Sequence, residues 1–361
     1  MTRAAVLHEA GSPMTIADID LAPTGPGQVR VRIRATGVCH SDLSLARGSL
    51  AQPVPAVLGH EAAGVVTDVG ADVTTVAVGD HVVLIWSPPC RKCFFCTRGE
   101  AHLCERAAAD STSSTYASLE GVRLHQGLGT ASFAEETLVL ERSVVPIPDD
   151  VPFEIGALMG CAVTTGVGAV LTTAKVPAGA TVAVFGCGAV GLSVIQGARV
   201  AGASQVIAVD LSAERLALAQ TMGATDIVDA SGDAEKAIRG LTGKRGVDFA
   251  FEAVGRSTTI KSAWRSTRRG GTAVVVGVGR LEDEVSFNAL ELFYQARTLV
   301  GCYYGSVDPA ADIPRLVDLH RTGALDIAAL VGTPIDLDEI DASFVAMEEG
   351  RGARAVVMFD Q

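Results

Sequence analysis

Four cysteines lie close together in the first third of the chain, with two, two and seven residues between them: Cys90, Cys93, Cys96 and Cys104. This spacing can gather four thiolates around one tetrahedral ion, and zinc is the usual occupant of such a site. A metal with four protein ligands has no position left for a substrate, so the site is structural and performs no chemistry. A catalytic metal would need a second set of ligands that leaves one position open.

The chain offers such a set in Cys39, His60 and Cys161, with Glu61 beside the histidine. Two thiolates and an imidazole neutralise a divalent zinc and leave its fourth position free. Taken singly, each of these residues is more often a packed core residue, so only their combination indicates a metal. Asp42 could hold the second nitrogen of His60 and fix its tautomer. A turn-capping role for Asp42 fits the spacing equally well.

A glycine-rich turn marks a second kind of site. Gly186, Gly188 and Gly191 form a G-x-G-x-x-G pattern directly after an apolar stretch at 181–185 and at the start of a helical pattern. Such a turn lets the backbone approach a pyrophosphate and directs a helix N-terminus at the phosphates. Asp210 ends the next predicted strand, where an acid accepts hydrogen bonds from the ribose hydroxyls and repels a 2′-phosphate. The sequence therefore predicts binding of NAD rather than NADP.

Length and composition predict a globular protein of two domains. The chain has 361 residues, of which 48% are hydrophobic and 19% charged, enough to bury large cores. Its net charge of −12 argues against nucleic acid or an anionic membrane as a partner. There is no apolar run long enough to span a bilayer and no signal-peptide pattern at the N-terminus, so we expect a cytoplasmic protein.

Disulfides are an alternative use of the eight cysteines. Disulfide scaffolds are usually small and loop-rich, whereas this chain is long. Six of the eight cysteines also lie in the metal-ligand settings described above, and only Cys187 and Cys302 stand alone. Thiolates held for metal are the better interpretation.

The chain falls into two parts with different sequence patterns, and the elements that these patterns predict must position the residues named above. Up to about residue 150, short alternating stretches such as 29–34 are separated by Gly and Pro, which predicts a small β-rich domain of the barrel type. From about residue 164, apolar strands alternate with helical patterns, as in a doubly wound parallel sheet. The strands expected there are 181–185, 205–209, 226–228, 247–251 and 272–277, and the helices are 189–201, 212–222 and 258–268. Two amphipathic helices, 313–321 and 337–349, and a strand at 355–359 follow.

Over essentially its full length, the chain resembles the zinc-dependent medium-chain alcohol dehydrogenases, in particular the class III-like branch and the branch acting on aryl and allylic alcohols. The stretch GHEAAGVVTDVG at 59–70 matches the zinc signature of that family, and the four cysteines match in all three spacings. The resemblance implies an α/β protein with a GroES-like β-rich catalytic domain at 1–163 and 301–361, which carries a structural zinc lobe at about 88–106. An NAD-binding Rossmann domain with a doubly wound parallel sheet would occupy 164–300. The substrate would bind in the cleft between these domains.

The resemblance also implies ligands and partners. NAD and two zinc ions, one catalytic and one structural, are the expected cofactors. Dimers of this family pair their Rossmann sheets edge to edge, and tetramers also occur, so a homodimer or homotetramer is expected.

Site roles carry over position by position. Cys39, His60 and Cys161 match the catalytic zinc ligands, and Glu61 matches an acid near the metal. Ser41 matches the hydroxyl that hydrogen-bonds the alcohol, and Trp86 matches an aromatic wall of the substrate pocket. The positions that match cofactor contacts are His40 and Arg354 at the pyrophosphate, Gly186, Gly188, Ala189, Val190 and Gly191 in the turn, Asp210 and Arg215 at the adenosine ribose, and Thr165, Val254, Val276, Gly277 and Val278 at the nicotinamide end.

Two positions depart from the family pattern. Ser44 stands where many members carry a histidine that passes the alcohol proton to solvent, and His40 stands where many have arginine. The proton could leave through water or through His40, and the sequence does not decide between them.

The implied reaction is the reversible oxidation of primary alcohols to aldehydes by hydride transfer to NAD, and Trp86 favours aromatic or allylic alcohols. A thiol-dependent formaldehyde dehydrogenase acting on S-hydroxymethyl thiol adducts is the alternative, because it shares every motif. A zinc-free quinone or enoyl reductase, or a protein without enzymatic activity, fits less well, because neither needs Ser41 together with the complete ligand set.

Overall fold

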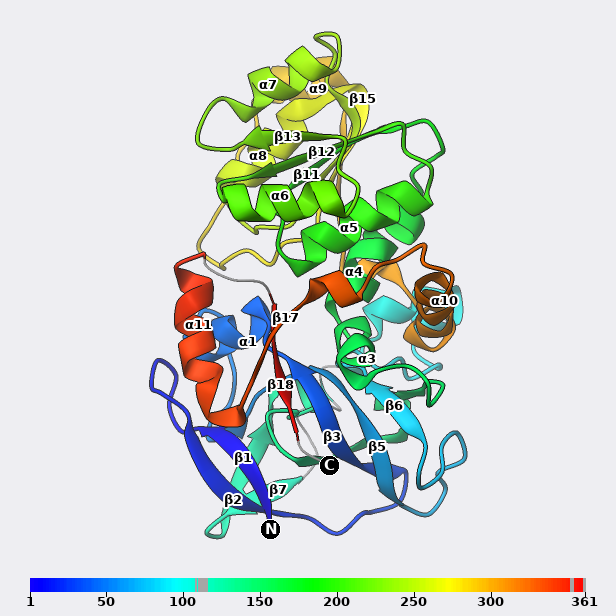
Figure 1. The fold of residues 1–361 in the computed structure, drawn as a ribbon, viewed down its shortest axis with the longest axis vertical. Coiled ribbons are helices and arrows are strands. Elements are labelled where there is room, and N and C mark those ends of the chain that lie inside the picture. The colour runs from blue at the N-terminus through cyan, green and yellow to red at the C-terminus, as the bar shows by residue number, and fades with distance from the viewer. Residues whose placement is uncertain (108, 110–115, 351–353, 360–361) are drawn as a thin grey trace. The chain divides into compact units, whose positions relative to one another are not determined.

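The computed structural model describes residues 1–107, 109, 116–350 and 354–359 (Figure 1). The chain divides into two compact units. The first comprises Met1–Cys161, Asp308–Asp318 and Ile327–Gln361, and the second comprises Ala162–Val307 and Leu319–Asp326. The first unit is rich in antiparallel strands and the second contains a parallel sheet, so the expected α/β class is confirmed.

Two sheets form the first unit. A closed barrel contains β1 (Thr2–Leu7), β2 (Thr15–Leu21), β7 (Ala117–Leu119), β8 (Val122–Gln126) and β4 (Ala56–Val57). The second sheet has the strand order β10 (Val144–Pro146), β6 (His81–Leu84), β5 (Glu61–Val69), β3 (Gln28–Gly37), β18 (Arg354–Met358) and β17 (Val331–Ile335), and β9 (Glu136–Leu140) also pairs with β3. In β3 the apolar residues Val29, Val31 and Ile33 are buried and the arginines between them are not, as the alternation predicts.

Among the described residues, three α-helices lie wholly in this unit: α1 (His40–Ala46), α3 (Phe153–Met159) and α11 (Ile340–Glu348). Helix α10 (Pro309–Arg321) contributes its first residues to it and begins four residues before the predicted start at 313. A proline at the first position of a helix loses no hydrogen bond, because that N–H group has no partner within the helix. The amphipathic pattern of the sequence predicts α10 from residue 313 to residue 321 but not its first turn, 309–312.

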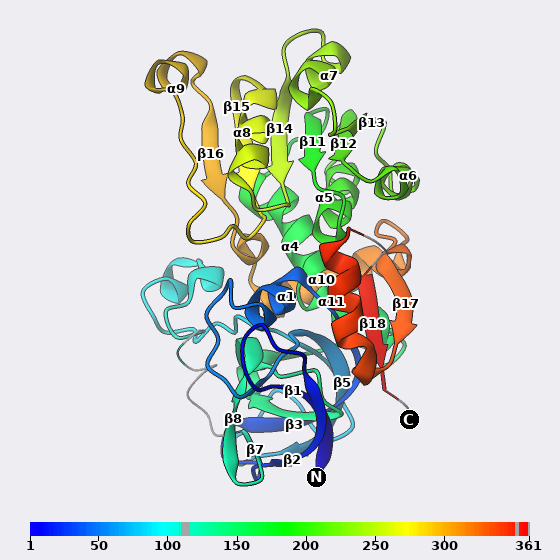
Figure 2. The ribbon, with the colours of Figure 1, turned by 90° about the vertical axis from the view of Figure 1, so that its left-hand side faces the viewer.

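The second unit is built around a six-stranded sheet in which all neighbours are parallel. Its strand order is β13 (Asp226–Asp229), β12 (Gln205–Asp210), β11 (Thr181–Phe185), β14 (Val247–Glu252), β15 (Thr267–Val275) and β16 (Thr298–Gly301). Its helices are α4 (Ala162–Gly168), continued by a π-helical segment (Ala169–Ala174), α5 (Ala189–Val200), α6 (Ala213–Thr221), α7 (Ala234–Leu241), α8 (Ser257–Ser266) and α9 (Ala289–Gln295). Figure 2 shows α8 and α5 on opposite faces of the sheet. The doubly wound sheet is confirmed, and its order reverses between β11 and β14, the place where such sheets bind ligands.

Two adjoining predicted elements in this unit have wrong bounds, since the strand expected at 272–277 is β15 at Thr267–Val275. The helix expected at 258–268 ends at Ser266, and Thr267 already begins strand β15. Thr267 is fully buried and pairs with Val247, and Arg268 donates a hydrogen bond of 2.6 Å to Asp248 on the neighbouring strand. The polar run at 265–269 looks like a solvated helix end in the sequence because this carboxylate partner lies 20 residues away.

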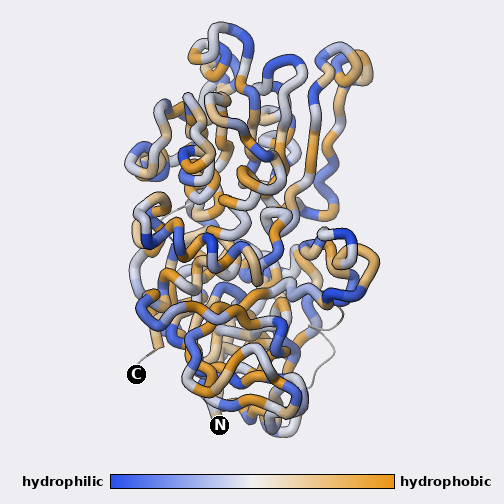
Figure 3. Tube along the Cα trace, turned by 90° about the vertical axis from the view of Figure 1, so that its right-hand side faces the viewer, coloured by the Kyte–Doolittle hydropathy of each residue, from blue (hydrophilic) through white to orange (hydrophobic). Residues whose placement is uncertain are grey.

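Hydrophobic positions, orange in Figure 3, recur along the chain in both units. Among the described residues there is no single helix long and apolar enough to cross a membrane. Only α3 together with α4 and its π-helical continuation reaches the required length and composition, and these helices are bent relative to one another.

Candidate zinc centres and dinucleotide site

The first unit brings Cys39, His60, Glu61 and Cys161 together, with one potential ligand atom from each within 4.8 Å of the others. Strands β3 and β5 are paired so that Gly37 lies opposite Glu61, and this register places the residues after β3 beside those before β5. The cysteine and histidine from these two segments, together with Cys161 directly after the α3 region, are all at most 8% exposed. The fold therefore brings together three potential metal donors from distant parts of the chain.

Asp42 orients two of these donors. Its Oδ1 atom lies 2.9 Å from Nδ1 of His60 and accepts a hydrogen bond of 3.1 Å from the N–H of Gly59. Its Oδ2 atom accepts a hydrogen bond of 3.2 Å from the N–H of Cys39. Because the aspartate is fully buried and binds Nδ1, the proton of the neutral imidazole is held there and Nε2 is left as the donor to a metal.

The two thiols of the cluster, those of Cys39 and Cys161, share a hydrogen bond that shifts the pKa of both. The hydrogen bond from Cys161 holds the pKa of Cys39 well below its ordinary value, and the same contact, together with burial, raises the pKa of Cys161. Burial alone would lower the pKa of His60, but Asp42 and Cys39 raise it well above its usual value. Removal of the second proton from the pair is thus opposed by the hydrogen bond between the two thiols and by burial, and also by the negative charge on Cys39, which a bound cation would neutralise.

Glu61 faces an arginine that the sequence places elsewhere. Its Oε1 atom lies 3.3 Å from Nη2 of Arg354. The other terminal nitrogen of this guanidinium, Nη1, donates a hydrogen bond of 2.8 Å to the carbonyl of Val38. Burial raises the pKa of Glu61 to about 7, while Arg354 acts in the opposite direction. The expected contact of Arg354 with a pyrophosphate stays a prediction, and its contact with Glu61 was not expected.

The donor chemistry of this cluster fits zinc. Buried ionisable groups are normally paired or bound to a metal, because an isolated charge in a protein interior is costly. Two thiols and an imidazole nitrogen aimed at one point, with a carboxylate fixing the imidazole, form the three-ligand set of a catalytic zinc site.

The four cysteines of the second cluster also converge, with sulfur atoms within 4.8 Å of one another. Cys96 begins a 3₁₀ turn (Cys96–Arg98), and a second such turn (Ala101–Leu103) leads directly into Cys104. The backbone N–H of Cys96 lowers the pKa of Cys93 to about 6, whereas burial raises the pKa of Cys96 to about 12. All eight cysteines of the chain are free thiols, and this set has the composition of a closed structural zinc site.

The glycine turn of the second unit has the geometry that phosphate binding requires. Gly186 has φ +91°, a conformation that favours glycine, and Gly188 precedes the first turn of α5, which opens with Ala189 and Val190. A side chain on Gly191 would collide with the carbonyl of Gly186, whereas a Cβ atom on Gly188 would meet no atom of the described residues within 4 Å apart from its own chain neighbours. The backbone at Gly188 is therefore open to a ligand at the helix N-terminus, as a pyrophosphate needs.

Asp210 is fixed at the end of β12. Its Oδ2 atom accepts a hydrogen bond of 2.7 Å from the N–H of Cys187, and its Oδ1 atom accepts one of 2.9 Å from the N–H of Ser212. Only 8% of the residue is exposed, and Arg215 lies in the first turn of the following helix α6. The carboxylate is thus held beside the glycine turn with lone pairs left for a ribose.

The remaining expected residues fall in both units. In the second unit, Thr165 lies in α4, and four others follow the carboxyl ends of β14 and β15: Val254, Val276, Gly277 and Val278. In the first unit, α1 carries an exposed His40 and a half-buried Ser41 in its first turn. Also in the first unit, the Trp86 ring stands edge-on to the His60 ring, with 6.4 Å between their centres.

Known proteins resemble the chain along its whole length. The family model described as an alcohol dehydrogenase GroES-like domain matches residues 25–149, and the one described as a zinc-binding dehydrogenase matches residues 189–321. An S-(hydroxymethyl)glutathione dehydrogenase from Synechocystis is 38% identical over 99% of this chain and its own full length. The chain belongs to the zinc-dependent medium-chain alcohol dehydrogenases.

Two solved structures are also similar to this dehydrogenase. Benzyl alcohol dehydrogenase from Acinetobacter calcoaceticus is 33% identical, with a TM-score of 0.92 and coverage of 99% of both chains. A zinc-binding dehydrogenase from Sinorhizobium meliloti, solved with NADP bound, is 28% identical, with a TM-score of 0.82 and the same coverage. As a member of the family, the protein is an NAD-dependent oxidoreductase with zinc as its metal, and its two cysteine-containing clusters are suited to hold one zinc ion each.

Proposed function

We propose that this dehydrogenase oxidises primary alcohols with an aromatic or allylic body to aldehydes, with NAD as the acceptor. The observation that carries the proposal is the position of Trp86, whose ring lies edge-on to that of His60 in the candidate catalytic cluster. An aromatic side chain there offers a flat apolar surface beside the reacting carbon, and pairs of aromatic rings attract one another beyond simple burial. The similarity to a benzyl alcohol dehydrogenase supports the same substrate class.

The metal roles follow from the donor geometry. Cys39, His60 and Cys161 would hold the catalytic zinc, and Asp42 would keep Nε2 of the histidine directed at it. When bound, zinc supplies the Lewis acidity that favours loss of the alcohol proton, and NAD supplies the hydride acceptor. Glu61 would place a negative charge close to the metal. The buried guanidinium of Arg354, which pairs with it, would hold its carboxylate in position.

Ser41 would accept the alcohol proton, because its hydroxyl can accept one hydrogen bond while donating another. From Ser41 the proton would pass to His40 or to water. The exposure of His40 suits either route, since an exposed imidazole can exchange protons directly with solvent.

Cofactor binding would use the turn Gly186–Gly191 for the pyrophosphate and Asp210 with Arg215 for the adenosine ribose. Thr165, Val254, Val276, Gly277 and Val278 would surround the nicotinamide and its ribose, and Arg354 and His40 would complete the pyrophosphate contacts. The buried carboxylate of Asp210 favours NAD, because a 2′-phosphate would meet its negative charge.

A thiol-dependent formaldehyde dehydrogenase is the second candidate. The Synechocystis relative carries the name S-(hydroxymethyl)glutathione dehydrogenase, and the same zinc and NAD chemistry would serve an S-hydroxymethyl adduct. The two candidates differ only in what accommodates the body of the substrate: an aromatic surface in the first, and polar or basic groups in the second.

We also propose that catalysis resides in a domain formed by 1–163 and 301–361, that 164–300 bind NAD, and that the protein is a homodimer, with a homotetramer as the alternative. Strand β16 ends the parallel sheet, and no other strand of the described residues pairs with its outer side. The helix before it exposes large apolar side chains: Leu290, Leu292, Phe293 and Tyr294. An exposed sheet edge beside apolar surface is a typical place for subunit contact.

Initial rates of NADH formation test the substrate. Ethanol, benzyl alcohol, geraniol and a thiol adduct of formaldehyde would be compared, before and after removal of zinc and again after its return. We expect benzyl alcohol and geraniol to exceed ethanol, with activity that disappears and returns with zinc. Turnover of the thiol adduct alone would select the second candidate, and inactivity on all four would contradict both.

A further inference from the structure

The reaction described above does not use Glu252, a carboxylate in the interior of the second unit. It is the last residue of β14 and is 0% exposed. In the parallel sheet it lies between Phe185 of β11 and Val275 of β15, at the carboxyl end of the central strands. Ligands of such sheets bind at this end. A buried acid at this position calls for a reason, because burying a carboxylate costs free energy.

One oxygen of Glu252 fixes the loop that follows its own strand. Its Oε1 atom accepts hydrogen bonds from the N–H groups of Val254 (3.0 Å) and Gly255 (2.8 Å) and from the hydroxyl of Thr259 (2.6 Å). No hydrogen-bond partner of Oε2 occurs among the described residues. The carboxylate thus directs its bonding at this loop and at the first turn of α8, which follows it.

The main chain of the same residue fixes the loop after β15. The carbonyl of Glu252 accepts hydrogen bonds from the N–H groups of Val276 (2.8 Å) and Gly277 (2.9 Å). One residue therefore joins the two loops that supply the expected nicotinamide contacts.

These loops are closely packed against one another. A Cβ atom on Gly277 would lie 2.7 Å from the backbone nitrogen of Val254, and one on Gly255 would meet the backbone of Val278. A Cβ atom on Gly186 would lie 2.7 Å from the side chain of Val254, so the glycine turn is packed against the same loop. A shift of the loop after β14 must consequently displace its neighbours.

We propose that Glu252 is a positioning residue for the nicotinamide end of the cofactor: it holds Val254 and Gly255 against Gly277 and Val278, so that the ring is received in one orientation. The proposal rests on the NAD site proposed above. In this role Glu252, which is fully buried, acts on the cofactor through the two loops.

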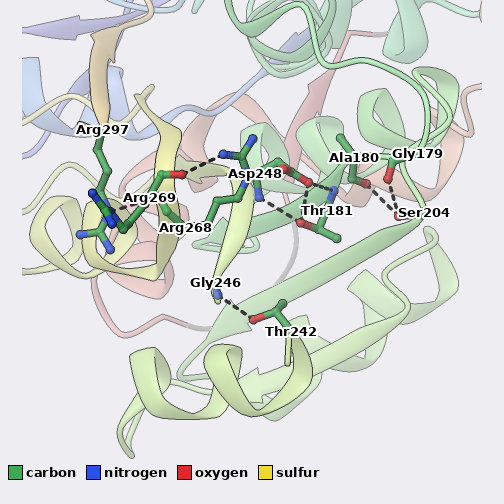
Figure 4. A network of polar contacts seen from close by, with 10 residues as sticks. All are labelled: Gly179, Ala180, Thr181, Ser204, Thr242, Gly246, Asp248, Arg268, Arg269 and Arg297. Carbon is green, nitrogen blue, oxygen red and sulfur yellow. Dashed lines mark hydrogen bonds and ion pairs between the residues drawn. The ribbon is translucent and has the colours of Figure 1, made fainter. Parts of the chain in front are cut away.

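The same strand provides a matched control at its other end. Asp248 accepts hydrogen bonds from the N–H and hydroxyl of Thr181 on β11, both 2.8 Å, and from Arg268 on β15 (Figure 4). It joins β14 to the same two neighbouring strands, but near the amino end of the sheet. A variant at Asp248 therefore reports general weakening of the sheet without disturbing the ligand end.

The test compares the binding of NADH with that of ADP-ribose, which lacks the nicotinamide, in the full-length zinc-loaded protein. For Glu252→Ala we expect the Kd of NADH to rise about tenfold, which corresponds to roughly one hydrogen bond to a charged group, while the Kd of ADP-ribose stays within about twofold. Asp248→Asn should lower the Tm but leave both Kd values unchanged. Equal changes of both Kd values in Glu252→Ala, or no change in either, would overturn the proposal.

Glu252→Gln keeps the test decisive if the alanine variant does not fold. The amide retains one acceptor oxygen for the loop, so we expect a smaller rise in the NADH Kd, about threefold, with ADP-ribose again unaffected. Unchanged NADH binding in a folded Glu252→Gln protein would overturn the proposal in that case. A parent protein that binds neither ligand would instead contradict the cofactor assignment.

Discussion

At the scale of single residues, Asp42 decides how the metal donors are presented. It holds Nδ1 of His60 and the backbone of Cys39 and Gly59 while being fully buried. We expect Asp42→Asn to retain zinc about 10 to 100 times less tightly, because an amide holds the imidazole tautomer less firmly than a carboxylate does. Zinc content measured during titration with a chelator tests this. Asp68→Asn, an exposed change on β5, is the control, and equal zinc retention in both variants would contradict the role.

Ser41 and Ser44 form a matched pair on α1, three residues apart and both half-buried. If Ser41 accepts the alcohol proton, Ser41→Ala should lower kcat at neutral pH by about 10² to 10⁴ and leave the KM for NAD nearly unchanged. Ser44→Ala should change kcat by no more than about threefold, since loss of an unused hydroxyl has little effect on the transition state. Steady-state rates of both variants between pH 6 and pH 10 would measure this. Parallel losses in kcat and NAD affinity would make Ser41 structural.

The donors of the four-cysteine cluster could be predicted from sequence because their spacing is local, whereas Cys39, His60 and Cys161 lie far apart in the chain and only their combination indicated a metal. Cys90, Cys93 and Cys96 are separated by two residues each, and Asp42 is one helical turn from Cys39. The ion pair of Glu61 with Arg354 could not be predicted in this way, because β18 returns from the far end of the chain to pair with β3. No local sequence pattern predicts a contact that only the tertiary fold creates.

At the scale of elements, the segment of the four-cysteine cluster contains only two short 3₁₀ turns among its described residues. Both are short, and Phe94 beside them is exposed. We expect Cys93→Ser to release one zinc ion per chain and to lower the Tm by several degrees, because binding energy at a structural zinc site contributes to folding. Zinc stoichiometry and thermal unfolding measure the two effects. Cys302→Ser, outside both clusters, should keep both ions, and a stable Cys93→Ser protein with one zinc would contradict a stabilising role.

Asp248 predicts a pH dependence of stability for the parallel sheet. Burial would raise its pKa, but the N–H of Thr181 and the guanidinium of Arg268 hold it below its usual value. A lowered pKa means that the unfolded chain takes up protons first as the pH falls. The stabilisation is therefore complete above the unfolded value of about 3.9 and is lost as the pH falls through the folded value.

Urea unfolding of the parent and Asp248→Asn measures this contribution directly. At pH 7 we expect the variant to be less stable by about 1 to 2 kcal/mol, as for the loss of a hydrogen bond to a charged group. The difference should persist down to about pH 5 and shrink below about pH 4. A difference that grows with acidity would contradict the assignment.

Much of the strand-and-helix alternation of the second unit was predictable, because strands such as β11 and β12 are continuous or nearly continuous apolar runs. The end of α8 was not, since Thr267 and Arg268 have no helix-stopping residue before them. What places them in a strand is their pairing with Val247 and Asp248 on β14, which is tertiary information. Sequence thus gives the order of elements more reliably than their ends.

At the scale of the whole molecule, subunit association is the property most open to test. The net charge of −12 opposes association through random surface contact, so a stable dimer needs a defined apolar surface. Figure 3 shows hydrophobic positions on α9 and β16, where Phe293 is 82% and Leu299 42% exposed. Main-chain groups on the outer side of β16 can extend the sheet into a second copy, and side chains of α9 can cover the junction.

Replacing Phe293 by Glu places a charge in this surface without touching a buried core. If the surface joins two copies, Phe293→Glu should weaken their association, because burying an unpaired charge in an interface costs free energy. The mass measured by light scattering during gel filtration should then fall from that of two or four chains toward that of a smaller assembly. Val122→Glu is the control, because Val122 is also exposed but lies on β8 of the first unit. A parent that elutes as a single chain would contradict the dimer. An oligomer unaffected by Phe293→Glu would move the contact to another face.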